Sequence, residues 1–369
     1  MLPSSLLLFL VFALTTARNS TWLIWGQGTL PNDADRAFGL ASACGSVLLS
    51  IALLIPSLRR RANLSIEHWL ACDFLCQAMF LIANTIYGVS HYLLFLTFLV
   101  NTILSSFQLG WAIQQAIYLS QDRYFAVRCF GTLAYVGTII VVMLDSGLGV
   151  VIAIIAMAGI GAVANSQHHW NNGSKNDLDP TRLVPALTNR SLVWITTLGV
   201  VTACASRIYE SCGLPEVLRS DSAIMGLLLL GALEVTSLLT AKWLTRWLNV
   251  VVWNVFLWVL AYMILEFVNW QPFLFALPFM AVNCLATTQI QIAGEVVARK
   301  ENVRNFQVWM SNISSFFGLI VVTVAKFQND AKPWPVGLAV ASCAVVIVVV
   351  MQRWQSEKFS KFSRLYSKG

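Results

Sequence analysis

The chain has 369 residues, of which 57% are hydrophobic and only 11% are charged, and its mean hydropathy is +0.70. This composition excludes a soluble globular domain and most nucleic-acid-binding proteins, because too few polar side chains remain to cover a water-exposed surface. The net charge of +7 comes from basic residues that gather between apolar segments, which indicates membrane topology and no nucleic-acid partner.

The first apolar segment is too short to span a membrane. Residues 6–14 are apolar and are followed by small residues that end at Ala17, a pattern that suits cleavage by signal peptidase. We therefore predict a signal peptide over 1–17 and a short lumenal segment over 18–37, where Asn19 can be glycosylated. Because no Lys or Arg precedes the apolar run, an uncleaved anchor is the alternative.

Eleven later segments are each close to the roughly 20 apolar residues that a membrane-spanning helix needs. They are 38–57, 67–88, 92–118, 130–145, 147–165, 192–208, 222–241, 247–267, 272–297, 307–326 and 335–352. The predicted fold is therefore all-α: a polytopic helical membrane protein with about eleven transmembrane helices after a signal peptide.

Basic residues orient these segments. Clusters at Arg59–Arg61, at Arg299 and Lys300, and in the tail 353–369 all fall on one side when the eleven segments alternate in direction, and this side is predicted to be cytosolic. The stretch 130–165 could instead be a single helix, which would put the polar loop 166–191 in the lumen. Every later loop would then invert, so the charge distribution favours two helices.

One segment has a distinctive pattern. Residues 53–88 read LLIPSLRRRANLSIEHWLACDFLCQAMFLIANTIYG: an apolar helix, Pro56, three arginines and a second helix from Trp69. This pattern resembles the repeat unit of PQ-loop membrane proteins, to which the SWEET transporters are related, although Ser57 stands where that family usually has glutamine.

The resemblance implies parallel three-helix repeats. The first repeat would cover 38–128 and the last 271–352, since each has a basic loop that closes on a tryptophan, Trp69 or Trp309. The middle helices, 129–270, have no motif of their own. The alternative is that basic loops followed by tryptophan occur in any polytopic protein, because both residue types favour the membrane interface.

Acidic residues inside membrane segments are candidate functional groups, because burying a charge in lipid is costly. Asp73 lies in the second predicted helix, one turn past Trp69, and Glu234 lies centrally in the seventh. A buried carboxylate can exchange a proton, as proton-coupled transport requires. The alternative is that Asp73 only accepts hydrogen bonds that hold neighbouring helices together.

Amide side chains form a second group of candidates for a solute or proton pathway, since a polar solute needs neutral donors and acceptors near the midplane. With the two acids, the predicted pathway residues are Asp73, Gln77, Asn84, Asn101, Gln108, Glu234, Asn283, Gln289 and Asn312. Pro56 and Pro278 are predicted hinges, because proline removes a backbone donor. The same amides could simply join helices.

The predicted function is transport of a small polar solute such as an amino acid or a sugar, possibly proton-coupled, in the secretory pathway, lysosome or vacuole, or plasma membrane. No cofactor or metal is predicted, because the eight cysteines are scattered. The alternatives are a non-transporting receptor or scaffold and a lipid-modifying enzyme. An enzyme is disfavoured because the four histidines lie in or beside loops. The oligomeric state does not follow from the sequence.

Overall fold

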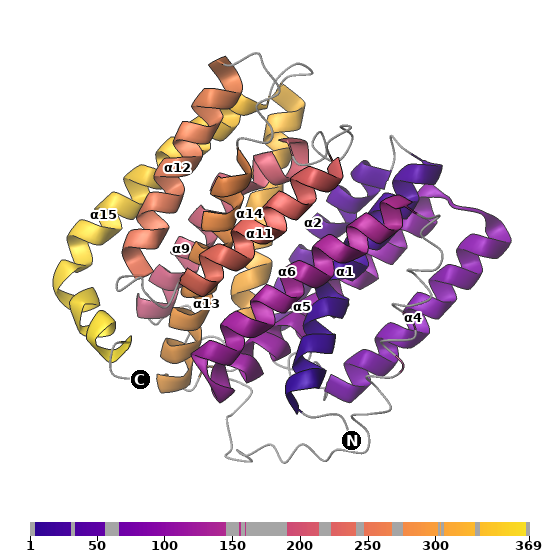
Figure 1. Cartoon of the computed structure of the whole chain (residues 1–369), viewed down its shortest axis with the longest axis horizontal. Coiled ribbons are helices and arrows are strands. Elements are labelled where there is room, and N and C mark those ends of the chain that lie inside the picture. Colours follow the sequence, from indigo (N-terminus) through magenta and orange to yellow (C-terminus); the bar gives the residue numbers. More distant parts are fainter. Residues whose placement is uncertain are drawn as a thin grey trace. The chain divides into compact units, whose positions relative to one another are not determined.

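A computed structural model of the chain describes residues 4–30, 34–55, 66–144, 155, 159, 190–213, 223–240, 247–267, 276–301, 303, 306–328 and 333–366. Its α-helices are α1 (Ser4–Thr29), α2 (Ala34–Leu54), α4 (Ile66–Tyr87), α5 (His91–Leu119), α6 (Gln121–Leu144), α9 (Arg190–Ile208), α11 (Ala223–Thr240), α12 (Trp247–Phe267), α13 (Leu277–Lys300), α14 (Phe306–Gln328) and α15 (Trp334–Tyr366) (Figure 1). In this part of the chain, eight helices are long and apolar enough to cross a membrane. The predicted all-α, polytopic membrane fold is confirmed.

Most predicted segments coincide with helices, and the differences lie at their ends. The segment predicted at 130–145 begins earlier, at Gln121, because Ser120 accepts a hydrogen bond from the backbone N–H of Arg123 (3.1 Å) and Asp122 lies in the first turn. The predicted tail 353–369 is helical as far as Tyr366. The predicted helix 147–165 and the polar loop 166–191 lie almost wholly outside the described residues.

The N-terminal region differs from the predicted division at residue 17. Residues 4–29 form one continuous helix, α1, so that much of the segment predicted to be lumenal is helical too. Leu8, Val11 and Leu14 are completely buried within this helix, which packs on α5 and α6. Glycosylation of Asn19 and cleavage of 1–17 stay predictions, and this packing argues against the cleavage.

The contacts divide the chain into two compact units. Unit 1 comprises residues 1–193 and 294–313. Within it, α1 packs on α6 and α5, while α2 and α4 pack on α5. Two glycines permit close approach of these helices. A Cβ added at Gly131 of α6 would lie 2.2 Å from the Phe12 ring of α1, and one at Gly45 of α2 would lie 3.1 Å from Thr102 of α5.

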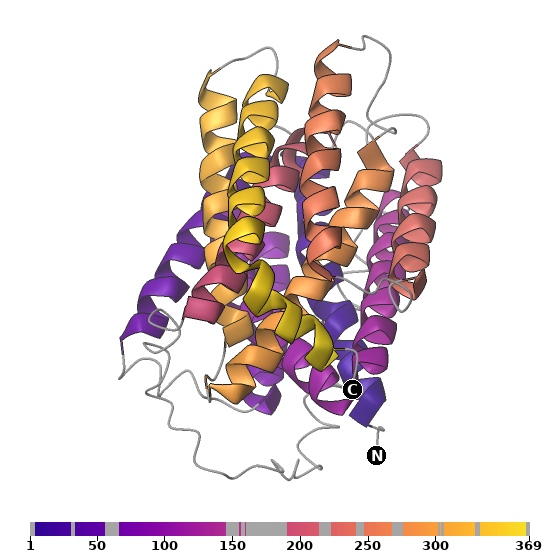
Figure 2. The ribbon, with the colours of Figure 1, turned by 90° about the vertical axis from the view of Figure 1, so that its left-hand side faces the viewer.

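Unit 2 comprises residues 194–293 and 314–369, and its helices α12 and α15 lie side by side (Figure 2). Its core contains four large aromatic residues, Tyr209, Trp258, Tyr262 and Trp334. Neighbouring rings in this group are 5.7–6.4 Å apart between centroids. Aromatic pairs at such distances stabilise a core beyond the burial of their area.

The end of α9 is opened by a side chain from α12. The hydroxyl of Tyr262 donates to the carbonyl of Ala205 (2.7 Å) and accepts from the N–H of Tyr209 (3.3 Å). These two backbone groups are four residues apart and would otherwise bond each other in a regular helix. A π-helix, Tyr209–Gly213, begins at this position, as expected where a side chain enters the helical hydrogen-bond ladder.

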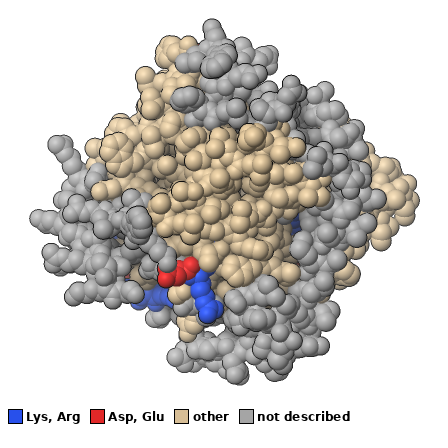
Figure 3. Space-filling model, in the orientation of Figure 1, with Lys and Arg blue, Asp and Glu red and all other residues tan. Residues whose placement is uncertain are grey.

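The described surface fits a lipid environment. On the face shown in Figure 3, it is almost entirely uncharged, and the few charged atoms in view lie mainly near one edge. Large apolar side chains on several helices face outwards, among them Met79, Met225 and Trp253, each at least 65% exposed. A water-soluble protein rarely exposes so many apolar side chains together, whereas lipid solvates them.

Candidate functional site

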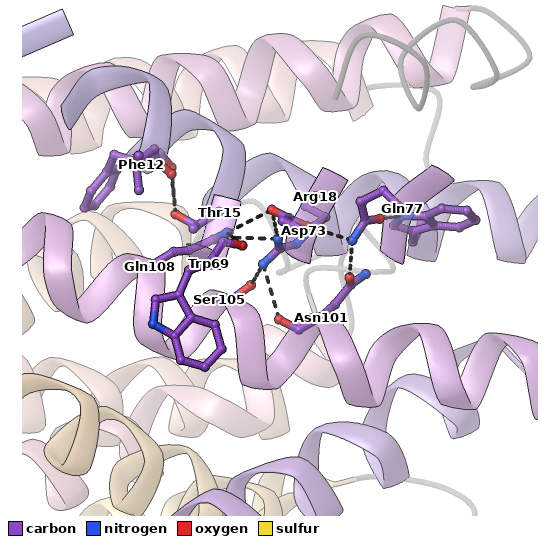
Figure 4. A network of polar contacts seen from close by, with 11 residues as sticks. Phe12, Thr15, Arg18, Trp69, Asp73, Gln77, Asn101, Ser105 and Gln108 are labelled. Carbon is purple, nitrogen blue, oxygen red and sulfur yellow. Dashed lines mark hydrogen bonds and ion pairs between the residues drawn. The ribbon is translucent and has the colours of Figure 1, made fainter. Parts of the chain in front are cut away.

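The main polar site in unit 1 is an ion pair between Arg18 of α1 and Asp73 of α4. Nη1 of Arg18 donates to Oδ2 of Asp73, and both side chains are completely buried (Figure 4). The opposite charges cancel, so the pair lies within the helices without a net charge. Asp73, the leading acid predicted from the sequence, is therefore paired, and its partner comes from the segment predicted as signal peptide and lumen.

Two glutamines complete the surroundings of Asp73. Nε2 of Gln108 donates to Oδ2 (3.0 Å) and Nε2 of Gln77 donates to Oδ1 (3.0 Å). The same Gln108 accepts from Arg18 (3.2 Å) and donates to the carbonyl of Trp69 (3.3 Å). Asp73 therefore accepts three hydrogen bonds, one of them from a cation.

A third helix supplies the other groups around Arg18. Its Nη2 donates to the backbone carbonyl of Asn101 (3.3 Å) and to the hydroxyl of Ser105. Oδ1 of Asn101 accepts from Gln77 (2.6 Å), whose own Oε1 accepts from the indole N–H of Trp22 (2.6 Å). We call Arg18, Asp73, Gln77, Asn101, Ser105 and Gln108 the polar network.

Helical periodicity explains this convergence. Asp73 and Gln77 are one turn apart on α4, Arg18 and Trp22 are one turn apart on α1, and three polar residues share one face of α5. The α5 residues are Asn101, Ser105 and Gln108. The network thus joins three helices, and a buried network of this kind fixes their mutual rotation because every misplaced group would lose its partner.

Four predicted pathway residues come together in the polar network: Asp73, Gln77, Asn101 and Gln108. Asn84 lies on the same helix, but its Nδ2 donates to the carbonyl of Phe80 within α4 (2.7 Å). Asn312 donates to the carbonyl of Val308 (2.6 Å) and accepts from Ser106 of α5 (3.2 Å). Asn84 and Asn312 therefore lie outside the network.

The remaining candidates belong to unit 2 or to undescribed residues. Asn283 accepts from Nδ2 of Asn254 (3.1 Å). Gln289 is buried in α13, and Glu234 is half-buried in α11. Pro278 is the second residue of α13, where a missing N–H breaks no helical hydrogen bond, so no interior kink arises there. Pro56 lies outside the described residues.

A second ionic cluster in unit 1 did not emerge from the sequence. Glu295, which is 3% exposed, pairs with Arg299 one turn later on α13 (Nε–Oε1 3.1 Å). Arg299 also donates to the carbonyl of Gln114 on α5 (3.0 Å) and lies over the Tyr118 ring, 5.0 Å from its centroid. These contacts hold the C-terminal end of α13 against the C-terminal end of α5.

Within the described residues, no three His, Cys, Asp or Glu side chains gather closely enough to hold a metal ion. The polar network instead offers a guanidinium, a carboxylate, three amides and a hydroxyl. Such a set can bind a polar molecule by hydrogen bonds.

The chain was compared with protein families, curated proteins and solved structures, and only the solved structures gave matches. No protein-family model and no curated protein matches the sequence. Among solved structures, FucP, a major facilitator superfamily transporter in the outward conformation, superposes with a TM-score of 0.69 at 15% identity, over 94% of this chain and 97% of FucP. The chain has a major-facilitator-like fold.

Two further solved structures agree with this fold. The nucleoside transporter NupG has a TM-score of 0.62 at 17% identity, over 95% of this chain and 97% of NupG. A bacterial homologue of the iron transporter ferroportin, in an outward-facing state, has a TM-score of 0.64 at 13% identity, over 96% of this chain and 100% of the homologue. All three are transporters, in line with the function predicted from the sequence.

The predicted resemblance to PQ-loop and SWEET proteins is wrong, because the similar structures are major facilitator transporters. The physical reason lies in the first helix. The proposed first repeat, 38–128, omitted α1, yet α1 packs on both α5 and α6 and supplies Arg18. A bundle that includes α1 is not the three-helix unit that the motif implied.

Proposed function

We propose that this protein transports a small polar solute across a membrane of the secretory pathway, the lysosome or vacuole, or the cell surface. The observation that carries the proposal is the buried Arg18–Asp73 pair, which is surrounded by amides of α4 and α5 in a major-facilitator-like fold. Ionisable groups inside membrane helices are expensive to keep and are functional candidates by default. The likeness to known transporters over nearly the whole chain supports the same reading.

The proposal involves no catalysed reaction, and it leaves open a proton as coupling ion, with Asp73 as its carrier. The test is uptake of labelled solutes by liposomes that contain the purified protein, compared with protein-free liposomes. We expect uptake of at least one small polar solute, and we expect substitutions in the polar network to reduce it. Failure to move any solute of a panel that covers sugars, nucleosides, carboxylates and amines would contradict the proposal and favour a receptor or scaffold.

A further inference from the structure

In the polar network, two buried side-chain donors have no acceptor, whereas each side-chain oxygen already has at least one donor. Every side-chain oxygen of Asp73, Gln77 and Gln108 accepts at least one hydrogen bond, as does Oδ1 of Asn101. By contrast, Nε of Arg18 and Nδ2 of Asn101 are buried and donate to nothing. Both residues are 0% exposed. A buried donor without an acceptor is costly because it has lost its hydrogen bonds to water, so the network favours a molecule that supplies acceptors.

The two unused donors belong to one place in the fold. Nη2 of Arg18 bonds the backbone of Asn101 itself, which holds the guanidinium beside the residue that carries the other unused donor. They lie between α1 and α5, with Ser105 one turn along α5 from Asn101 (Figure 4). A ligand that accepts from both donors therefore has to carry at least two oxygen atoms.

The net charge of the network indicates whether this molecule is charged or neutral. Asp73 already neutralises Arg18, and no other charged side chain among the residues that the structure describes bonds to the network. A carboxylate or phosphate would add an unbalanced negative charge in a buried site, which is costly. A cation would leave both unpartnered donors without an acceptor and would bring an uncompensated positive charge close to the guanidinium of Arg18. An uncharged molecule that accepts through hydroxyl or carbonyl oxygens suits both conditions.

We propose that the polar network binds an uncharged, oxygen-rich solute such as a sugar or a nucleoside, through Nε of Arg18 and Nδ2 of Asn101. This inference rests on the proposed transport function and names its substrate class. Because Arg18 and Asn101 are completely buried, α1 and α5 must move apart to admit the solute. The solute then forms hydrogen bonds with the two unused donors, and these replace the contacts between α1 and α5 that are broken.

The test uses four probes with the purified full chain: D-galactose, uridine, succinate and spermidine. Binding is measured as a shift of the thermal unfolding midpoint in detergent, and transport as uptake into liposomes. We expect D-galactose or uridine to raise the midpoint and to enter the liposomes, and succinate and spermidine to do neither. A shift produced only by a charged probe, or by none of the four, overturns the inference.

The two measurements separate this inference from the proposed function. A midpoint shift with D-galactose or uridine but no uptake would support the binding class and contradict transport. Uptake of succinate or spermidine alone would support transport and contradict the binding class.

Substitutions at Asn101 then locate the site. Asn101→Asp keeps the oxygen that accepts from Gln77 but replaces the unused donor by a second oxygen and a negative charge. Asn101→Leu removes both amide atoms without adding a charge. We expect each to weaken the response to the active probe at least tenfold. Asn84→Leu is the matched control, since Asn84 is a buried amide of unit 1 outside the network. A full response in Asn101→Asp, with an unliganded midpoint near that of the unsubstituted protein, overturns the assignment.

Discussion

Arg18 and Asp73, 55 residues apart in the sequence, form an ion pair from which solvent is completely excluded. The pair joins α1 to α4, and each charge neutralises the other. Removal of either partner would leave a single buried charge, which is far more costly than removal of both.

The first prediction concerns this mutual dependence. Arg18→Met should lower the free energy of unfolding by about 3–5 kcal/mol, because the Asp73 carboxylate loses its counter-charge. Asp73→Leu should have a comparable effect through Arg18. The double variant should cost clearly less than the sum of the two, as measured by unfolding in mixed detergent micelles. Additive effects would show that the two charges are not coupled.

The second prediction concerns the proton. Asp73→Asn alone is a poor test, since it leaves Arg18 uncompensated. The variant Arg18→Gln/Asp73→Asn keeps the network neutral and amide-rich. If Asp73 carries the coupling proton, this variant should lose the pH dependence of uptake while still folding.

Cys76 of α4 lies close enough to Asp73 and Arg18 to interact with both charges, and Cys72 lies one turn before it. A Cys72→Ala/Cys76→Ala variant is therefore the control, and it should keep the pH profile of the unsubstituted protein. An unchanged profile in the neutral double variant would mean that Asp73 serves to join helices.

Periodicity and composition were sufficient to predict most of the later helices, since a membrane helix must carry a long apolar run, but they assigned α1 to a signal peptide and a lumenal segment. They were also sufficient to select Asp73, Gln77, Asn101 and Gln108, because polar residues within such runs are rare. Arg18 was missed for a local reason. It follows a short apolar run with small residues, which resembles a cleavage site, and its partner lies on a different helix, which no sequence spacing reveals.

The third prediction tests whether α1 remains in the mature protein. A Cβ at Gly131 would overlap the ring of Phe12, at 2.2 Å, whereas a Cβ at Gly137 on the same helix meets nothing within 4 Å. Gly131→Ala should therefore destabilise the protein by about 1–3 kcal/mol through overpacking. Gly137→Ala should be neutral or stabilising by up to about 1 kcal/mol, because alanine favours helix.

If residues 1–17 were cleaved, Phe12 would be absent and both glycine variants would behave alike. Mass spectrometry of the mature protein gives an independent answer. We expect peptides from within residues 1–17, since α1 packs on α5 and α6.

The mistaken family resemblance has a physical explanation as well. Basic residues and tryptophan favour the membrane interface in any polytopic protein, so a loop such as 59–69 recurs without common descent. Packing distinguishes the folds, and packing depends on contacts such as those of α1 with α5 and α6 that lie far apart in sequence. The motif therefore described one helix pair correctly and the architecture incorrectly.

The last prediction concerns the opened end of α9. Tyr262→Phe removes the hydroxyl that bridges the carbonyl of Ala205 and the N–H of Tyr209. These two backbone groups can then bond each other directly, so the loss should stay near the net value of one hydrogen bond, about 1 kcal/mol. The matched control is Tyr92→Phe, because Tyr92 is 88% exposed and its substitution should change the free energy of unfolding very little. Hydrogen exchange is the more specific measurement. In Tyr262→Phe the amide of Tyr209 should be at least as protected as its helical neighbours, because a regular helical turn replaces the contacts of the tyrosine hydroxyl. Faster exchange of the Tyr209 amide, together with a decrease in the free energy of unfolding well above 1 kcal/mol, would contradict this. It would mean that Ala205 and Tyr209 cannot bond each other directly and that the π-helix depends on the tyrosine hydroxyl.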